Sequence, residues 1–140
     1  MAPRVPTQLY FIHLALMLSP ALFAVVIFLI ILPGASDALP AKEDVRVYQT
    51  VAAALAVIGV GFSQLVPRFM MRRRTQLLLR QYISMKIEKW ALVEGAALTI
   101  TVVFYLTHEK NLLISLGVLI ALMAFMRPTA DEMAGYNVKG

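Results

Sequence analysis

The chain has 140 residues, of which 60% are hydrophobic, and it carries a formal net charge of +5 at pH 7. Soluble domains contain about 45–50% apolar residues, and a soluble fold of this size could not bury the excess, so we predict an integral membrane protein. The length favours a single domain, residues 1–140, without a separate soluble enzyme domain. The absence of cysteine excludes disulfides, thiolate zinc sites and thiol catalysis.

Four apolar segments follow one another along the chain, and each is a candidate transmembrane helix. A bilayer core of about 30 Å needs about 20 helical residues. We therefore predict an all-α membrane protein with helices at about 9–32, 47–66, 88–107 and 111–127. The last two segments are short, but flanking Lys, Tyr and Trp side chains can extend them at the interface. A tight turn between them predicts a hairpin, and the whole is expected to be an antiparallel bundle.

The first segment has a second interpretation as a signal peptide. Its apolar run is longer than the usual stretch of about 7–15 residues, which favours an uncleaved anchor. The sequence Ser36-Asp37-Ala38 is an acceptable cleavage site, so this alternative stays open at this point.

Basic residues are distributed unequally between the two sides of the predicted bundle. Seven lie between the second and third segments, one precedes the first and two follow the fourth, which makes ten. The opposite side has three, Lys42, Arg46 and Lys110. Because Lys and Arg accumulate in cytoplasmic loops, this bias predicts that both ends of the chain lie in the cytoplasm.

A basic connector, residues 68–87, is expected on the cytoplasmic side. It is either an amphipathic helix in the membrane interface or the extensions of the two flanking helices. Four of its arginines are candidates for contact with anionic headgroups or with a partner protein: Arg72, Arg73, Arg74 and Arg80. Attraction of arginine to phosphate is not specific, and nucleic acid is not an expected partner. In the cytoplasmic tail, residues 128–140, Thr129, Asp131 and Glu132 can begin a short helix, because acidic residues suit a first turn.

Glu94 is the strongest candidate for a functional residue. An ionisable residue in a membrane helix is costly and marks a functional site by default. With Trp90 at the interface, Glu94 lies about 6 Å inside the start of the third segment. Its neighbours Ala91 and Gly95 form a small-xxx-small pair, which lets another helix approach closely.

Three further polar residues are expected at a similar depth near the cytoplasmic side: His13, Gln64 and Arg127. Together with Glu94 they form a candidate polar or ion site. The alternatives are that these groups pair and hold the bundle together, that they bind a proton or an ion, or that they face headgroups singly. Gly59 and Gly61 of the second segment indicate close helix packing rather than a site.

Motifs of soluble enzymes are absent, including the Walker loop, the dinucleotide-binding glycine pattern and HExxH. His13 and His108 are expected at opposite membrane faces, so they cannot share a metal or a haem. With no catalytic constellation visible, we expect neither an enzyme nor a bound cofactor.

Two resemblances add to this interpretation. Trp90-Ala91-Leu92-Val93-Glu94-Gly95-Ala96, with the closing Met126-Arg127-Pro128-Thr129, resembles small uncharacterised four-helix inner-membrane proteins of bacteria. This resemblance implies the fold and a multi-pass position in the bacterial inner membrane. Around Glu94-Gly95-Ala96, after a basic loop with Arg80-Gln81, the sequence is locally similar to rotor-ring proteolipids of ATP synthases, in which a helix carboxylate carries the ion. The second segment lacks their repeated glycines, and we do not adopt the rotor interpretation.

The leading functional hypothesis is a non-catalytic small subunit or accessory protein of a larger inner-membrane complex. Its expected partners are anionic lipid headgroups and other membrane subunits or further copies of the chain. The alternative is a small oligomeric transporter or ion-translocating unit that uses Glu94. Compact four-helix exporters have their key acid in the first helix, where this chain has His13.

Overall fold

A computed structural model describes residues 5–31, 33, 42–72, 77–136 and 138. The described elements are all helices, which confirms the predicted all-α class. In chain order they are α1 (Thr7–Val26), a π-helical continuation η1 (Ile27–Ile31), α2 (Lys42–Met71), α3 (Leu79–Thr107), α4 (Asn111–Phe125) and α5 (Ala130–Gly135). The possible cleavage site Ser36-Asp37-Ala38 lies outside the described residues, as do Arg73 and Arg74.

Three of these helices are long and apolar enough to cross a membrane. They are α1 together with η1, with 25 residues, and α2 and α3, with 29 residues each in the apolar range. Helix α4 is apolar but has only 15 residues. At 1.5 Å per residue it is about 22 Å long, which is shorter than a hydrocarbon core of about 30 Å.

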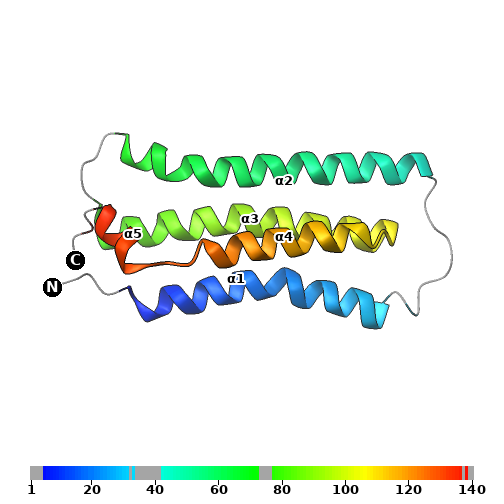
Figure 1. Ribbon diagram of the computed structural model, residues 1–140, viewed down its shortest axis with the longest axis horizontal. Coiled ribbons are helices and arrows are strands. Elements are labelled where there is room, and N and C mark those ends of the chain that lie inside the picture. Colours follow the sequence, from blue (N-terminus) through cyan, green and yellow to red (C-terminus); the bar gives the residue numbers. More distant parts are fainter. Residues whose placement is uncertain (1–4, 32, 34–41, 73–76, 137, 139–140) are drawn as a thin grey trace.

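Helix α3 lies at the centre of the molecule. It packs against α1, α2 and α4, and Figure 1 shows it with α4 between α1 and α2. Half of its most apolar stretch is buried, against 17% for α1 and 11% for α2. The colours of Figure 1 show α1 and α3 running in one direction and α2 and α4 in the other. The outer helices therefore present most of their apolar side chains outward.

The described part of the basic connector is largely helical. Arg68 lies in the last turn of α2, and Arg80 and Lys86 lie in the first turns of α3. Of the two interpretations of residues 68–87, the structure therefore has extensions of the flanking helices. The predicted bounds 47–66 and 88–107 followed apolar runs and missed these turns, because a helical backbone continues beyond the apolar residues.

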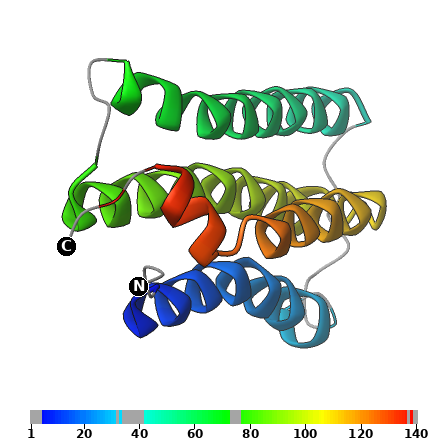
Figure 2. The ribbon, with the colours of Figure 1, turned by 60° about the vertical axis from the view of Figure 1, so that its left-hand side comes forward.

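The two ends of α4 have clear local causes. Before α4, His108 adopts a left-handed backbone with φ 56°, and its N–H donates to the Phe104 carbonyl at 2.8 Å, which ends α3. After α4, Pro128 disfavours a helical conformation at Arg127, so the helix stops at Phe125 instead of continuing to 127. The chain then turns into α5, which lies over α3 at the end of the bundle where α1 begins (Figure 2).

Gly59 allows α2 and α3 to approach each other closely. A Cβ at Gly59 would lie 2.9 Å from the Leu92 carbonyl oxygen and 3.3 Å from the Ala96 Cβ. A Cβ at Gly61 would meet no atom within 4 Å. The expectation of close packing is therefore confirmed at Gly59, whereas Gly61 faces open space.

The two glycines predict opposite effects of one substitution. Gly59→Ala should lower the free energy of unfolding by about 1–3 kcal/mol, because the α3 backbone must move away. Gly61→Ala should raise it by about 0.5–1 kcal/mol, because alanine favours the helix and nothing obstructs its methyl group. SDS titration of the protein in mild detergent measures both values. Equal effects at the two positions would contradict the α2–α3 packing.

Candidate functional site

The four residues of the predicted polar layer do not meet in one site. His13 is buried, Glu94 is partly exposed, and Gln64 and Arg127 are exposed. Gly59 lies against Leu92 and Ala96 of α3, and α2 and α3 run in opposite directions, so Gln64, five residues after Gly59, lies nearer the start of α3 than Glu94 does. Five helical residues correspond to about 7.5 Å along the axis.

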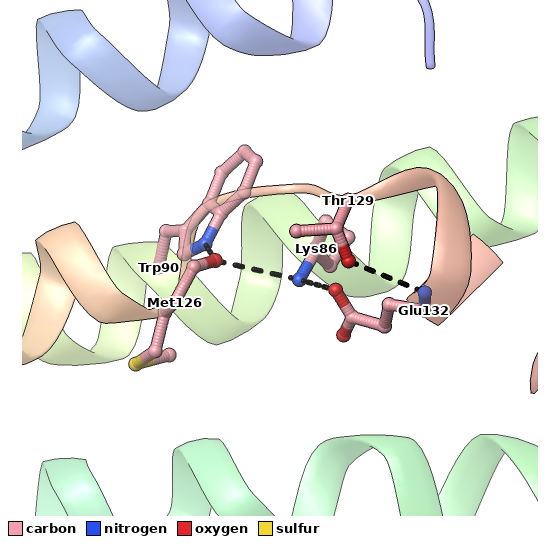
Figure 3. Close-up of polar contacts among 5 residues, drawn as sticks. All are labelled: Lys86, Trp90, Met126, Thr129 and Glu132. Carbon is pink, nitrogen blue, oxygen red and sulfur yellow. Dashed lines mark hydrogen bonds and ion pairs between the residues drawn. The ribbon is translucent and has the colours of Figure 1, made fainter. Parts of the chain in front are cut away.

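A different group of side chains converges at this end of the bundle. The Lys86 Nζ donates to a carboxylate oxygen of Glu132 at 2.6 Å and to the Met126 carbonyl at 3.4 Å. The Trp90 Nε1 donates to the same carbonyl at 3.0 Å. Figure 3 shows Lys86 between Met126 and Glu132, with Thr129 beside Glu132. Side chains of α3 thus hold both the end of α4 and the helix α5.

Burial makes this contact energetically important. The Lys86 side chain is 1% exposed, whereas that of Glu132 is 28% exposed. An ammonium group removed from water needs a counter-charge and hydrogen-bond acceptors to remain charged. The Met126 carbonyl is available because α4 ends there, and the last carbonyls of a helix lack partners within it. The Lys86 Nζ also lies 5.5 Å from the centre of the Trp90 ring, within range of a cation–π contact.

The C-terminal segment is ordered by its own local interactions as well. The Thr129 side chain accepts a hydrogen bond from the Glu132 N–H at 3.2 Å and caps α5. This confirms the short helix expected in the tail. Met133 of α5 is buried. Glu132 therefore has two roles, since its N–H binds the cap and its carboxylate binds Lys86.

Aromatic side chains surround the ion pair. The His13 ring packs against Trp90 with centroids 4.5 Å apart, and Tyr82 lies beside Tyr136 at 6.1 Å. Burial, followed by the negative charge of Glu132, raises the pKa of Tyr136 above its ordinary value. Two buried polar atoms here, His13 Nδ1 and the Tyr82 hydroxyl, have no hydrogen-bond partner among the described residues.

We call these residues the Lys86 cluster: His13, Tyr82, Lys86, Trp90, Met126, Thr129, Glu132 and Tyr136. Sequence reasoning found His13 but counted Lys86 only as an orientation charge. Two signals were present, namely the spacing of Lys86 and Trp90, which places them on one helix face, and the Thr-x-x-Glu pattern at 129–132. In the described part of the chain, no three His, Cys, Asp or Glu residues gather so as to hold a metal ion.

Glu94 lies apart from the cluster, on the partly exposed side of α3. Within the ranges that the structure covers, its carboxylate forms no hydrogen bond or ion pair. Ala91 and Gly95 are exposed beside it, and a Cβ at Gly95 would meet no atom within 4 Å. The small-xxx-small pair is therefore not used for packing by the described helices.

The two described arginines of those proposed for contact with headgroups lie on the surface. Arg72 and Arg80 are exposed, as are Arg68 and Arg127. All four belong to the end of the bundle that holds the Lys86 cluster, since they lie at the end of α2, at the start of α3 and after α4 (Figure 1). This end therefore has a basic surface over a paired, buried lysine.

Comparisons with known proteins add no assignment of family or function. No protein-family model, curated protein or solved structure matches the chain. The resemblance to small four-helix bacterial membrane proteins stays a prediction.

The unequal burial of the ion pair predicts unequal effects of its two single substitutions. Glu132→Gln should lower the free energy of unfolding by about 1–3 kcal/mol, because it leaves a buried ammonium without its carboxylate. Lys86→Met should be milder, because water can reach the Glu132 carboxylate. The double variant should be more stable than the sum of the two single effects predicts.

SDS titration of the two single variants and the double variant, with Asp131→Asn as the matched control, measures the coupling. Asp131 is exposed on the same helix, so its substitution should change stability little. Strictly additive effects would mean that Lys86 and Glu132 do not interact.

Proposed function

We propose that this chain is a non-catalytic small subunit or accessory protein of a larger complex in the bacterial inner membrane. In this proposal it spans the membrane four times as an antiparallel bundle, with α1, α2, α3 and α4 as the spans. Both chain ends face the cytoplasm.

The distribution of charge supports this orientation. Exposed arginines gather at the end of the bundle where α1 begins and α5 lies, which is the pattern of a cytoplasmic surface. There they can contact anionic headgroups. Lys110 before α4 and Arg127 after it are both exposed, so their long side chains can reach the interface and extend this short span.

The observation that carries the proposal is the open face around Gly95. Glu94 is an ionisable group on an apolar helix, and no partner for it lies in the described ranges. Such groups usually face another protein surface or a cavity rather than lipid. The exposed pair Ala91 and Gly95 lies beside it and allows close approach of a helix. A membrane helix from another subunit fits both features.

The linings of the surface grooves favour assembly over ion translocation. One groove between α1 and α3 reaches Leu98, one turn beyond Glu94, and is lined otherwise by Ser19, Leu22, Phe23 and Val26. A second groove, between α2, α3 and α4, is apolar except for Ser115. Apolar grooves suit lipid tails or a partner helix, whereas an ion path through Glu94 needs polar groups on both sides of the carboxylate.

A matched pair of glycine substitutions tests the assembly surface. Gly95 and Gly117 are both exposed, and a Cβ at either would meet no atom within 4 Å. Leucine at either position is therefore expected to leave the fold of the chain unchanged. Gly95→Leu should separate the chain from its complex, because it blocks close approach at Ala91 and Gly95. Gly117→Leu on α4 should not.

The measurement is size analysis and identification of co-purifying proteins after extraction in mild detergent. The wild-type chain and Gly117→Leu are expected in a larger assembly, and Gly95→Leu as the free chain. A wild-type chain that purifies alone as a monomer would contradict the proposal.

A further inference from the structure

The Lys86 cluster has the chemistry of a carboxylate-binding site. The Lys86 ammonium is almost fully buried and is oriented by the Met126 carbonyl, which also fixes the Trp90 ring beside it. A cationic donor in a place from which water is excluded binds an anionic acceptor more strongly than a donor in water. The Glu132 carboxylate occupies this place, at 2.6 Å from the Lys86 Nζ (Figure 3).

Helix α5, which carries the Glu132 carboxylate, is weakly anchored. Helix α5 has six residues, and a helix of this length is not stable alone in water. It is held by the ion pair, by the Thr129 cap, by the burial of Met133 and by contact between Tyr136 and Tyr82. A short element with few contacts is expected to open locally well before the bundle unfolds.

The fit between α5 and the site is also incomplete. The Tyr82 side chain is fully buried one turn before Lys86, and its hydroxyl has no hydrogen-bond partner among the described residues. A buried hydroxyl without a partner is unfavourable. A ligand with a carboxylate and a second acceptor oxygen would satisfy Tyr82 as well as Lys86. Glu132 is partly exposed, so an incoming carboxylate can reach the pair from that side.

We propose that Lys86, Trp90 and Tyr82 form a binding site for the carboxylate of an acidic helical peptide segment, and that α5 is the intramolecular ligand that keeps this site closed. The site is distinct from the Gly95 face on which the proposed assembly rests. Displacement of α5 by an acidic segment of a partner would exchange one Lys86–carboxylate pair for another. The buried ammonium therefore has a counter-charge both before and after the exchange.

Trp90 provides the readout, because it is the chain's single tryptophan and is buried in the site. In the full-length protein in detergent, Glu132→Gln should increase the undocked population of α5 about tenfold or more, as expected for loss of a charge-assisted hydrogen bond. Trp90 emission should shift to the red and become more sensitive to acrylamide. Asp131→Asn, the matched control, should behave like the wild type.

The second step adds a ligand in trans. A synthetic peptide of residues 127–140 should restore the protection of Trp90 in the full-length Glu132→Gln protein. The same peptide with Gln in place of Glu132 should not. Thr129→Ala, which weakens the cap of α5 but keeps both charges, should show a smaller rise in quenching that the wild-type peptide also reverses. Helix content from circular dichroism identifies any variant that fails to fold.

Three results would overturn the proposal. One is a Trp90 signal in folded Glu132→Gln that equals the signal of Asp131→Asn, since α5 would then not depend on its carboxylate. Another is equal restoration by the two peptides, which would show binding without recognition of a carboxylate. The third is no restoration by the wild-type peptide in either Glu132→Gln or Thr129→Ala, which would show that the site accepts no ligand in trans.

Discussion

The burial of one ammonium group organises one end of this molecule. Lys86 lies in the central helix with 1% of its side chain exposed, and a buried charge without partners would be strongly destabilising. Its partners come from elsewhere in the chain: a carbonyl that is free because α4 ends at Phe125, and a carboxylate 46 residues away on α5. The positive charge also lies favourably near the C-terminal end of α4. Pro128 ends α4 near this point, and the need of Lys86 for a carboxylate determines how α5 lies.

The same end also connects α1 to the central helix. Trp90 shares the Met126 carbonyl with Lys86 and packs on His13, so α1 joins the group through an aromatic contact. Helix α2 is attached differently, by the close approach of Gly59 to the α3 backbone. Polar contacts thus fix one end of the bundle, while small residues set the spacing of α2 and α3. The face of α3 with the exposed residues Ala91 and Gly95 is not packed against another described helix. For this reason we propose it as the assembly surface.

More of the fold than of the site could be predicted from the sequence. Long apolar runs predicted the helices, but apolarity does not show where a helix ends in water. The predicted bounds therefore left out the turns with Arg68 and Arg80, although extensions of the flanking helices were one of the two interpretations of the connector. Polar residues in apolar segments were a good signal for His13, yet the same rule chose Gln64 and Arg127, which face outward. Whether a polar residue faces the bundle or the outside depends on the rotation of its helix about the helix axis. This rotation cannot be inferred from counts of apolar residues. Lys86 was missed because its carboxylate partner is distant in sequence.

The measurement that tests the central claim most directly is the chemical reactivity of the lysines in the unmodified protein. An amine-reactive acetylating reagent in mild detergent, with mass-spectrometric detection, compares Lys86 with the exposed Lys110. Burial and the pair with Glu132 predict that Lys86 is acetylated far more slowly than Lys110, and that the difference disappears on unfolding. Equal rates in the folded protein would contradict a buried, paired Lys86.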